Sequence, residues 1–360
     1  MLTAIIFIIV LGILILVHEL GHFIFAKRAG MTVEEFGFGF PPRLWSIKKG
    51  GTVYSINLIP FGGYVKILGE DGEEKNKEGS FSSKSIWQRF VVISAGVVMN
   101  LFLAIFLLMV VNFFGLRIGV TDGSDTSKVK DLQVQIIQVN AKSPADMSGL
   151  KLLDTIVGFK SGDKLIYASS VGEVQSYIVD NAGNRVTMLI KRGDLVIEKI
   201  VEPRKNPPAG EGALGISLAL TGIVKYPWYE AVWRGVYDAY YLLINTVMGY
   251  YTLIKTLVVS GKLMSDVSGP IGIATLTGSA ARIGFNYLMQ FVAMISINLA
   301  VLNFIPFPAL DGGRALLLLV EKIKRSPINK KLEGRMNAIG FGLLILLMFY
   351  VTFRDLVKFF

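Results

Sequence analysis

Long apolar segments are the feature that most restricts what this chain can fold into. A helix of roughly 20 apolar residues crosses the hydrocarbon core of a bilayer. The sequence holds four such segments, at residues 2–25, 90–115, 287–310 and 336–353. Of its 360 residues, 52% are hydrophobic, which is more than a soluble chain usually carries. We therefore expect a polytopic α-helical membrane protein with about four spanning helices.

Charge and cysteine content exclude several kinds of protein. The net charge is +10, but the Lys and Arg residues flank the apolar segments, as the positive-inside rule predicts. This distribution argues against nucleic acid as a partner. Because the chain has no cysteine, it has neither disulfides nor thiolate ligands, and a metal must be held by His and carboxylates. We interpret the first apolar segment as a retained helix rather than a cleaved signal peptide.

Composition divides the chain into four parts, which we expect at 1–115, 116–218, 219–286 and 287–360. Within the polar region 26–89, the stretch TVYSINLIPFGGYVKILGE (52–70) alternates apolar and polar residues around Pro60 and Gly62–Gly63. This pattern predicts a β-hairpin. Residues 116–218 have the composition of a soluble domain with short β-type runs.

Three ionisable residues interrupt the first apolar segment. His18 and His22 are the only histidines, and their spacing of four puts them on one face of a helix. Glu19 adjoins the first of them. Ionisable groups inside a membrane cost at least ~2.5 kcal/mol each and usually serve a function. The HELGH pattern predicts two zinc ligands and a carboxylate that takes a proton from water.

A third protein ligand is needed, and Asp311 in NLAVLNFIPFPALDGGR (298–314) is the candidate. Pro306 and Pro308 should break the helix before it. Irregular backbone at membrane depth is tolerated where it lines a polar cavity. Asn303 adds an amide that can bond an extended peptide backbone.

Together, HELGH and NFIPFPALDGG resemble the site-2 protease family of intramembrane zinc metalloproteases, and the RseP-like bacterial branch in particular. FGFGFPPRLW, IPFGGYVKILGE, SAGVVMN and SGPIGIA (268–274) resemble further motifs of that branch, although Val97 stands where its second-helix motif has proline. The resemblance implies one Zn²⁺ per chain, held by His18, His22 and Asp311, with Glu19 as general base. It also implies a set of substrate-binding residues: Asn100, Asn303, Pro306, Pro308 and, on the cytoplasmic-side membrane-associated β-hairpin, Gly62, Gly63, Tyr64 and Val65.

The soluble domain resembles a PDZ domain. KSPADMSGLKLLDTIVGFKSGDK (142–164) is similar to the bacterial PDZ signature, with Leu153 where glycine is usual. The chain has room for one such domain. By resemblance, the peptide-binding loop would be Gly212, Ala213, Leu214, Gly215 and Ile216. Such a domain either binds a peptide tail or acts only as a steric lid, and the sequence leaves both open.

Loop charges predict the orientation of the chain in the membrane. Lys and Arg are abundant in 26–89 and 311–335, so these segments should be cytoplasmic. Both termini and the PDZ-like domain should then be extracytoplasmic. The stretch 239–254 is ambiguous between a spanning and an interfacial helix. One more crossing would carry Asp311 to the wrong membrane face, so we expect 227–262 to be interfacial.

The expected function is an intramembrane zinc endopeptidase of the bacterial inner membrane. It should cut transmembrane protein substrates that another protease has trimmed; by resemblance, these are an anti-sigma factor or remnant signal peptides. Its other partner is membrane lipid. Two alternatives are a membrane metal carrier or transporter and a PDZ-bearing membrane scaffold. A carrier needs neither Glu19 beside His18 nor a hairpin, and an intact HELGH motif argues against a scaffold.

Overall fold

The computed structural model describes residues 2–70, 77–120, 129–162, 164–208, 210–260, 269–326 and 328–359. Residues 261–262 of the expected interfacial helix and Ser268 of the SGPIGIA stretch lie outside these ranges. The chain forms two compact units. The first holds residues 1–108, 235–278 and 291–360, and the second holds residues 109–234 and 279–290.

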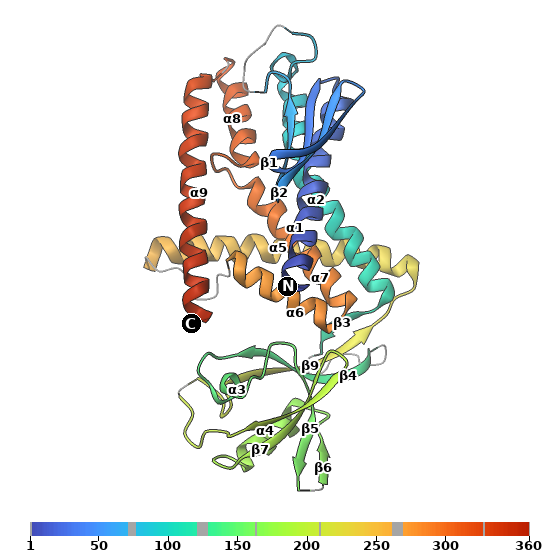
Figure 1. Cartoon of the computed structure of the whole chain (residues 1–360), viewed down its shortest axis with the longest axis vertical. Coiled ribbons are helices and arrows are strands. Elements are labelled where there is room, and N and C mark those ends of the chain that lie inside the picture. The colour runs from blue at the N-terminus through green and yellow to red at the C-terminus, as the bar shows by residue number, and fades with distance from the viewer. Residues whose placement is uncertain are drawn as a thin grey trace. The chain divides into compact units, whose positions relative to one another are not determined.

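Four helices in the described part of the chain are long and apolar enough to cross a membrane, which confirms the predicted number of spans. They are α1 (Leu2–Arg28), α2 (Ile86–Phe114), α7 (Phe285–Phe304) and α9 (Lys330–Phe359). A short helix, η1 (Phe81–Ser83), precedes α2. In Figure 1, α1 and α9 lie roughly parallel in the first unit, with opposite chain directions.

The third apolar segment is not helical over its whole expected length of 287–310. Helix α7 ends at Phe304, and a new helix, α8 (Asp311–Lys324), begins after an irregular loop. Pro306 and Pro308 lie in this loop, as predicted. The loop's carbonyl groups pack over the start of α8, because a Cβ on Gly312 would lie 2.3 Å from the carbonyl oxygen of Phe304. The glycines after Asp311 therefore let the loop fold back tightly.

The predicted hairpin within 52–70 is wrong in its turn and its pairing. Residues 52–67 form one strand, β2 (Thr52–Ile67), which pairs with β1 (Val33–Lys49). The tight turn lies at Gly50–Gly51, where both residues have positive φ, as a two-residue hairpin turn requires. Residues 53–56 and 63–66 both pair with 35–38, one on each side, so the two halves of β2 do not pair with each other. The segment 63–67 is thus an edge of this sheet.

Helix α5 (Trp228–Ser260) corresponds to the stretch expected to be interfacial. It is not among the helices apolar enough to span a membrane. The part of α5 in the first unit runs across the direction of α1 and α9 in Figure 1. Helix α6 (Pro270–Ile283) follows, and the Asp355 carboxylate of α9 accepts hydrogen bonds from the backbone N–H groups of Gly269 and Gly272 at its start. A carboxylate at a helix N-terminus is stabilising.

The second unit is built around an antiparallel sheet with strand order β3-β9-β4-β5-β7-β8, and β6 pairs with β5. Its strands are β3 (Leu116–Gly119), β4 (Val129–Val139), β5 (Thr155–Ser161), β6 (Lys164–Tyr167), β7 (Val186–Arg192), β8 (Leu195–Val201) and β9 (Ile216–Val224). Two helices, α3 (Pro144–Met147) and α4 (Val171–Asp180), accompany the sheet. Its core includes Ile136, Phe159 and Met188. Leu153 has φ +67°, the left-handed conformation that glycine adopts most readily.

Candidate functional site

Helices α1 and α2 cross closely at the two histidines. A Cβ on Gly21 of α1 would lie 2.4 Å from the carbonyl oxygen of Ala95 in α2. A Cβ on Gly96 would lie 2.4 Å from His22 Nε2 and 2.7 Å from His18 Cε1. Gly96 therefore faces the imidazoles and leaves the space that they occupy. We did not single out Gly96 from the sequence, although small residues in a spanning helix commonly mark a close helix contact.

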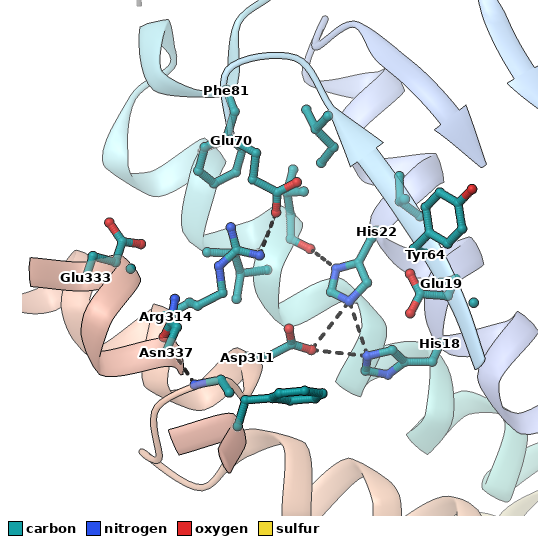
Figure 2. Close-up of a pocket in the computed structure, with 18 of the residues that line it drawn as sticks. His18, Glu19, His22, Tyr64, Glu70, Phe81, Asp311, Arg314, Glu333 and Asn337 are labelled. Atoms are coloured by element: carbon teal, nitrogen blue, oxygen red, sulfur yellow. Dashed lines mark hydrogen bonds and ion pairs between the residues drawn. The ribbon is translucent and has the colours of Figure 1, made fainter. Parts of the chain in front are cut away.

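His18, His22 and Asp311 converge, although 289 positions separate the last two in sequence (Figure 2). Asp311 Oδ2 lies 3.1 Å from His18 Nε2 and 3.4 Å from His22 Nε2. The two Nε2 atoms are 3.2 Å apart. All three ligand atoms thus lie within 4.8 Å of one another, and Asp311 Oδ2 is buried without a hydrogen-bond donor of its own. Two imidazoles and a carboxylate around one point match the donor set of a catalytic zinc site.

The Nδ1 atom of each imidazole, which faces away from Asp311, has a polar neighbour. His22 Nδ1 lies 2.8 Å from the carbonyl oxygen of Val92, which can only accept, so Nδ1 carries the proton and Nε2 is left free to bind a metal. The Asn100 amide lies 3.4 Å from His18 Nδ1, and its Oδ1 is buried with no donor. With that oxygen turned toward Nδ1, Asn100 would fix His18 in the same tautomer.

The assignment of Asn100 to substrate binding stays a prediction, and its placement points to another role. Its side chain is 1% exposed and sits beside His18 rather than in a cavity. Its backbone carbonyl accepts a hydrogen bond from the Ser296 hydroxyl of α7. This placement favours a role in orienting His18, and the bond from Ser296 joins α2 to α7.

A cavity of about 730 Å³ opens onto the three converging side chains. Glu19 lines it, and so do Gly63, Tyr64 and Val65 from the edge of the β1–β2 sheet. A Cβ on Gly63 would lie 3.0 Å from Glu19 Cγ, so this strand runs directly beside the Glu19 side chain. Figure 2 shows the strand passing His22 and Glu19 with the Tyr64 ring beside them.

Besides Asn100, four predicted substrate-binding residues in the described part of the chain do not line this cavity: Gly62, Asn303, Pro306 and Pro308. Asn303 is half-buried in the last turn of α7. Pro306 lines a separate apolar groove together with Trp87 and Leu319. The Pro308 carbonyl packs against Gly340 of α9. These prolines shape the loop that precedes Asp311 rather than the cavity wall.

Tyr64 is held in place from within the sheet. Its hydroxyl donates to Glu35 Oε1 at 2.7 Å, and the Ser55 hydroxyl donates to the same oxygen at 2.6 Å. Arg43 also pairs with it, at 2.6 Å. Burial would raise the pKa of Glu35, but the hydrogen bonds from Ser55 and Tyr64 and the charge of Arg43 outweigh burial and lower that pKa. Glu35 therefore stays ionised near neutral pH and keeps the Tyr64 ring at the cavity wall.

Further cavity residues come from the ends of the quoted motifs and from α9. Glu70 ends IPFGGYVKILGE, and Arg314 follows LDGG. Glu333 and Asn337 of α9 also line the cavity. The Asn337 side-chain oxygen accepts from the backbone N–H of Ala309, a residue with φ +75°. Sequence reasoning missed these four, and the only available signal was a charged residue closing each of the two motifs.

The predicted peptide-binding loop leads into β9 and includes its first residue, Ile216. Leu214 is 1% exposed and belongs to the core of the second unit. Several carbonyl groups of the loop already accept backbone hydrogen bonds: the Leu214 carbonyl from Ala145 and the Gly215 carbonyl from Asn140. Gly215 has φ +70°. The loop is therefore a tightly folded entry to β9.

Comparison with known proteins gives consistent matches over the whole chain. The model of peptidase family M50 matches residues 6–347. A Clostridium perfringens protein provisionally named a zinc metalloprotease is 37% identical over 96% of this chain and 95% of its own length. The regulator of sigma-W protease RasP of Bacillus subtilis is 29% identical over 99% of both chains. The regulator of sigma-E protease RseP of Escherichia coli is 28% identical over 97% of both chains.

Proposed function

The chain belongs to peptidase family M50 and is an intramembrane zinc metalloprotease, and from this premise we propose that His18, His22 and Asp311 bind its zinc ion and that Glu19 is the general base. The convergence of the three ligand atoms within 4.8 Å is the observation that carries the proposal. Glu19 lines the same cavity without being one of the three.

The residues of the chain would share the chemistry as follows. Zinc, when bound, supplies Lewis acidity and makes water easier to deprotonate. Glu19, next to His18 and facing the cavity, takes the proton of the attacking water and can return it to the leaving amine. Val92 and Asn100 keep the imidazoles in the tautomer that leaves Nε2 unprotonated. The sheet edge and the loop before Asp311 shape the cavity and limit its contact with lipid.

We further propose that the edge segment 63–67 holds the substrate as an added strand. The amides of a transmembrane helix are shielded by their own hydrogen bonds, so the substrate must unwind before hydrolysis. Unpaired N–H and C=O groups in a membrane are costly, and an exposed strand edge supplies replacement partners. Residues 63–67 pair with β1 on one side, and Gly63, Tyr64 and Val65 border the cavity beside Glu19.

Proline substitutions test this edge. Successive backbone N–H groups of a strand point to opposite sides. Of Val65→Pro and Lys66→Pro, one variant therefore removes an N–H that faces β1, and the other removes an N–H on the outer edge. The outer-edge variant should lose most cleavage of a helical membrane substrate and keep its zinc, because proline has no N–H to donate to the substrate backbone. Val65→Ala and Lys66→Ala are the matched controls: each keeps its backbone N–H, so the alanine variant at the affected position should cleave far better than the proline variant. Parent-level cleavage by both proline variants would show that the edge does not bind substrate.

The orientation in the membrane is proposed from loop charge. The Lys- and Arg-rich segments 26–89 and 311–335 would be cytoplasmic. Both termini and the second unit would then be extracytoplasmic in the bacterial inner membrane, with α5 interfacial. The substrates would be transmembrane segments of proteins first trimmed by another protease, such as an anti-sigma factor or a remnant signal peptide.

The expected division of the chain into four parts, with boundaries at residues 115, 218 and 286, stays a prediction.

The second unit is proposed to be a single PDZ-like domain. Its support is the 142–164 signature, the left-handed conformation at Leu153 and a strand, β9, that enters from a tight loop and contacts helix α4. The alignment with the Bacillus subtilis protein spans 442 positions against 360 residues here, so that protein has segments without a counterpart in this chain. Strand β3 pairs with Thr221–Val224 of β9, which leaves only the beginning of that edge for a peptide.

Deletion of residues 125–218 separates the two roles of this domain. A steric lid predicts that the deletion lets untrimmed substrates be cut. A peptide binder predicts slower cutting of trimmed substrates. The short free edge of β9 favours the lid. The measurement is the ratio of cleavage rates for matched long and trimmed substrates, and an unchanged ratio would exclude both roles.

The alternative roles as a metal carrier or a scaffold make different predictions. A carrier would move metal across vesicle membranes at a rate that does not depend on Glu19. A scaffold would keep its biological role without any zinc. The placement of Glu19 and the sheet edge around one cavity supports the protease over both.

A further inference from the structure

The ion pair between Glu70 and Arg314 joins two elements that border the cavity, and the proposed function gives it no role. Glu70 Oε1 lies 2.5 Å from Arg314 Nη1. The side chains are 19% and 28% exposed, and both line the cavity that holds the three converging ligands (Figure 2). A pair on an open surface contributes little. This one is largely shielded, so the loss of either partner is costly, although Arg314 also feels the charges of Asp311 and Glu333.

The Arg314 end of the pair is fixed to the metal site. Arg314 and Asp311 are three residues apart in α8, which puts them on the same face of that helix. Asp311 is the first residue of α8, and its Oδ2 faces both histidines. A change in the position of α8 at Arg314 therefore also moves Asp311.

The Glu70 end of the pair is fixed to the strand edge. Glu70 lies in a turn that directly follows β2. Three hydrogen bonds join this turn to neighbouring segments: Leu68 N–H to Thr32 O at 2.9 Å, Phe81 N–H to Leu68 O at 2.8 Å, and Ser82 Oγ–H to Gly69 O at 2.6 Å. At the other end of the segment, Gly63 packs against Glu19. The edge 63–67 is thus tied to the site at both ends.

We propose that the Glu70–Arg314 pair is a positioning device that sets the offset between the strand edge 63–67 and Asp311, and so selects which substrate bond lies at Glu19. This inference rests on the proposed function, because it requires a substrate strand on that edge. The rise per residue of a strand is about 3.3 Å, so a displacement of this size would present the neighbouring bond. A smaller displacement of the substrate strand would leave no peptide bond correctly placed at Glu19. A misplacement of about 1 Å can lower the rate of cleavage ~10²-fold.

The test compares Arg314→Glu, Glu70→Arg and the double charge swap in the full-length protein. A model membrane segment serves as substrate, and kcat, KM, product masses and zinc content are measured. Each single variant should lose roughly 10- to 100-fold in kcat, keep its zinc and cut at additional positions. The double variant should recover most of the rate and the parent product masses, because the opposite charges meet again.

Several outcomes would overturn the inference. These are single variants with parent rates and product masses, a double variant as impaired as the single ones, or zinc loss in the single variants, which would mean that the pair holds only α8. A pair with a merely structural role would lower the active fraction without changing the product masses. If charge reversal prevents folding, Arg314→Lys should keep the parent products and Glu70→Gln should broaden them. Failure of the proposed function is seen separately, as cleavage by Glu19→Gln.

Discussion

Glu19→Gln should bind zinc like the parent protein and lose at least ~10²-fold in the rate of peptide-bond cleavage, because the amide cannot take a proton from water. The reason for retained zinc is geometric: Glu19 lines the cavity, but the three converging ligand atoms belong to His18, His22 and Asp311. The measurements are zinc per protein after purification and cleavage of a model membrane segment by the same preparation.

Variants of the proposed ligands supply the contrast. His18→Ala, His22→Ala and Asp311→Ala should each lower zinc occupancy together with activity, because each removes one of three donors. Zinc loss in Glu19→Gln, combined with full zinc in Asp311→Ala, would falsify the assignment of base and ligand. Comparison of membrane proteins that accumulate in cells carrying Glu19→Gln would then identify substrates.

Gly96→Ala should reduce both zinc affinity and activity, although Gly96 offers no ligand atom. The added methyl group would lie 2.4 Å from His22 Nε2 and 2.8 Å from His18 Nε2, and neither imidazole can remain in place at those distances. Loss of outer support around a metal site typically costs 10–100-fold in affinity, and we expect roughly this effect from the displaced rings. Zinc titration of metal-depleted protein measures it.

Gly342→Ala is the matched control for Gly96→Ala. Gly342 also lies within a predicted spanning helix, α9, and a Cβ there would meet no atom within 4 Å. This variant should match the parent in zinc affinity and cleavage. If Gly96→Ala also matched the parent, α2 would not approach the histidines closely enough to contact them at Gly96.

The sequence by itself determined the four spans and the chemistry of the site. Apolar length is a local property, so the spans could be counted from residues alone. His18 and His22 are four apart on one helix, which puts both on one face without any tertiary information. Asp311 could be chosen because carboxylates inside apolar segments are few and costly. The end of α7 also followed from a local cause, the two prolines after Phe304.

The tertiary structure alone decided which distant residues surround that chemistry. The turn at Gly50–Gly51 and the placement of 36–38 between both halves of β2 depend on pairing between strands, for which the alternation in 52–70 gave no unique solution. Gly96 became important because α2 crosses α1 at His18 and His22, and Asn100 because the same crossing puts it behind His18. Glu70 and Arg314 meet across more than 240 positions of sequence. Such contacts depend on how helices and strands pack, and no local pattern encodes that packing.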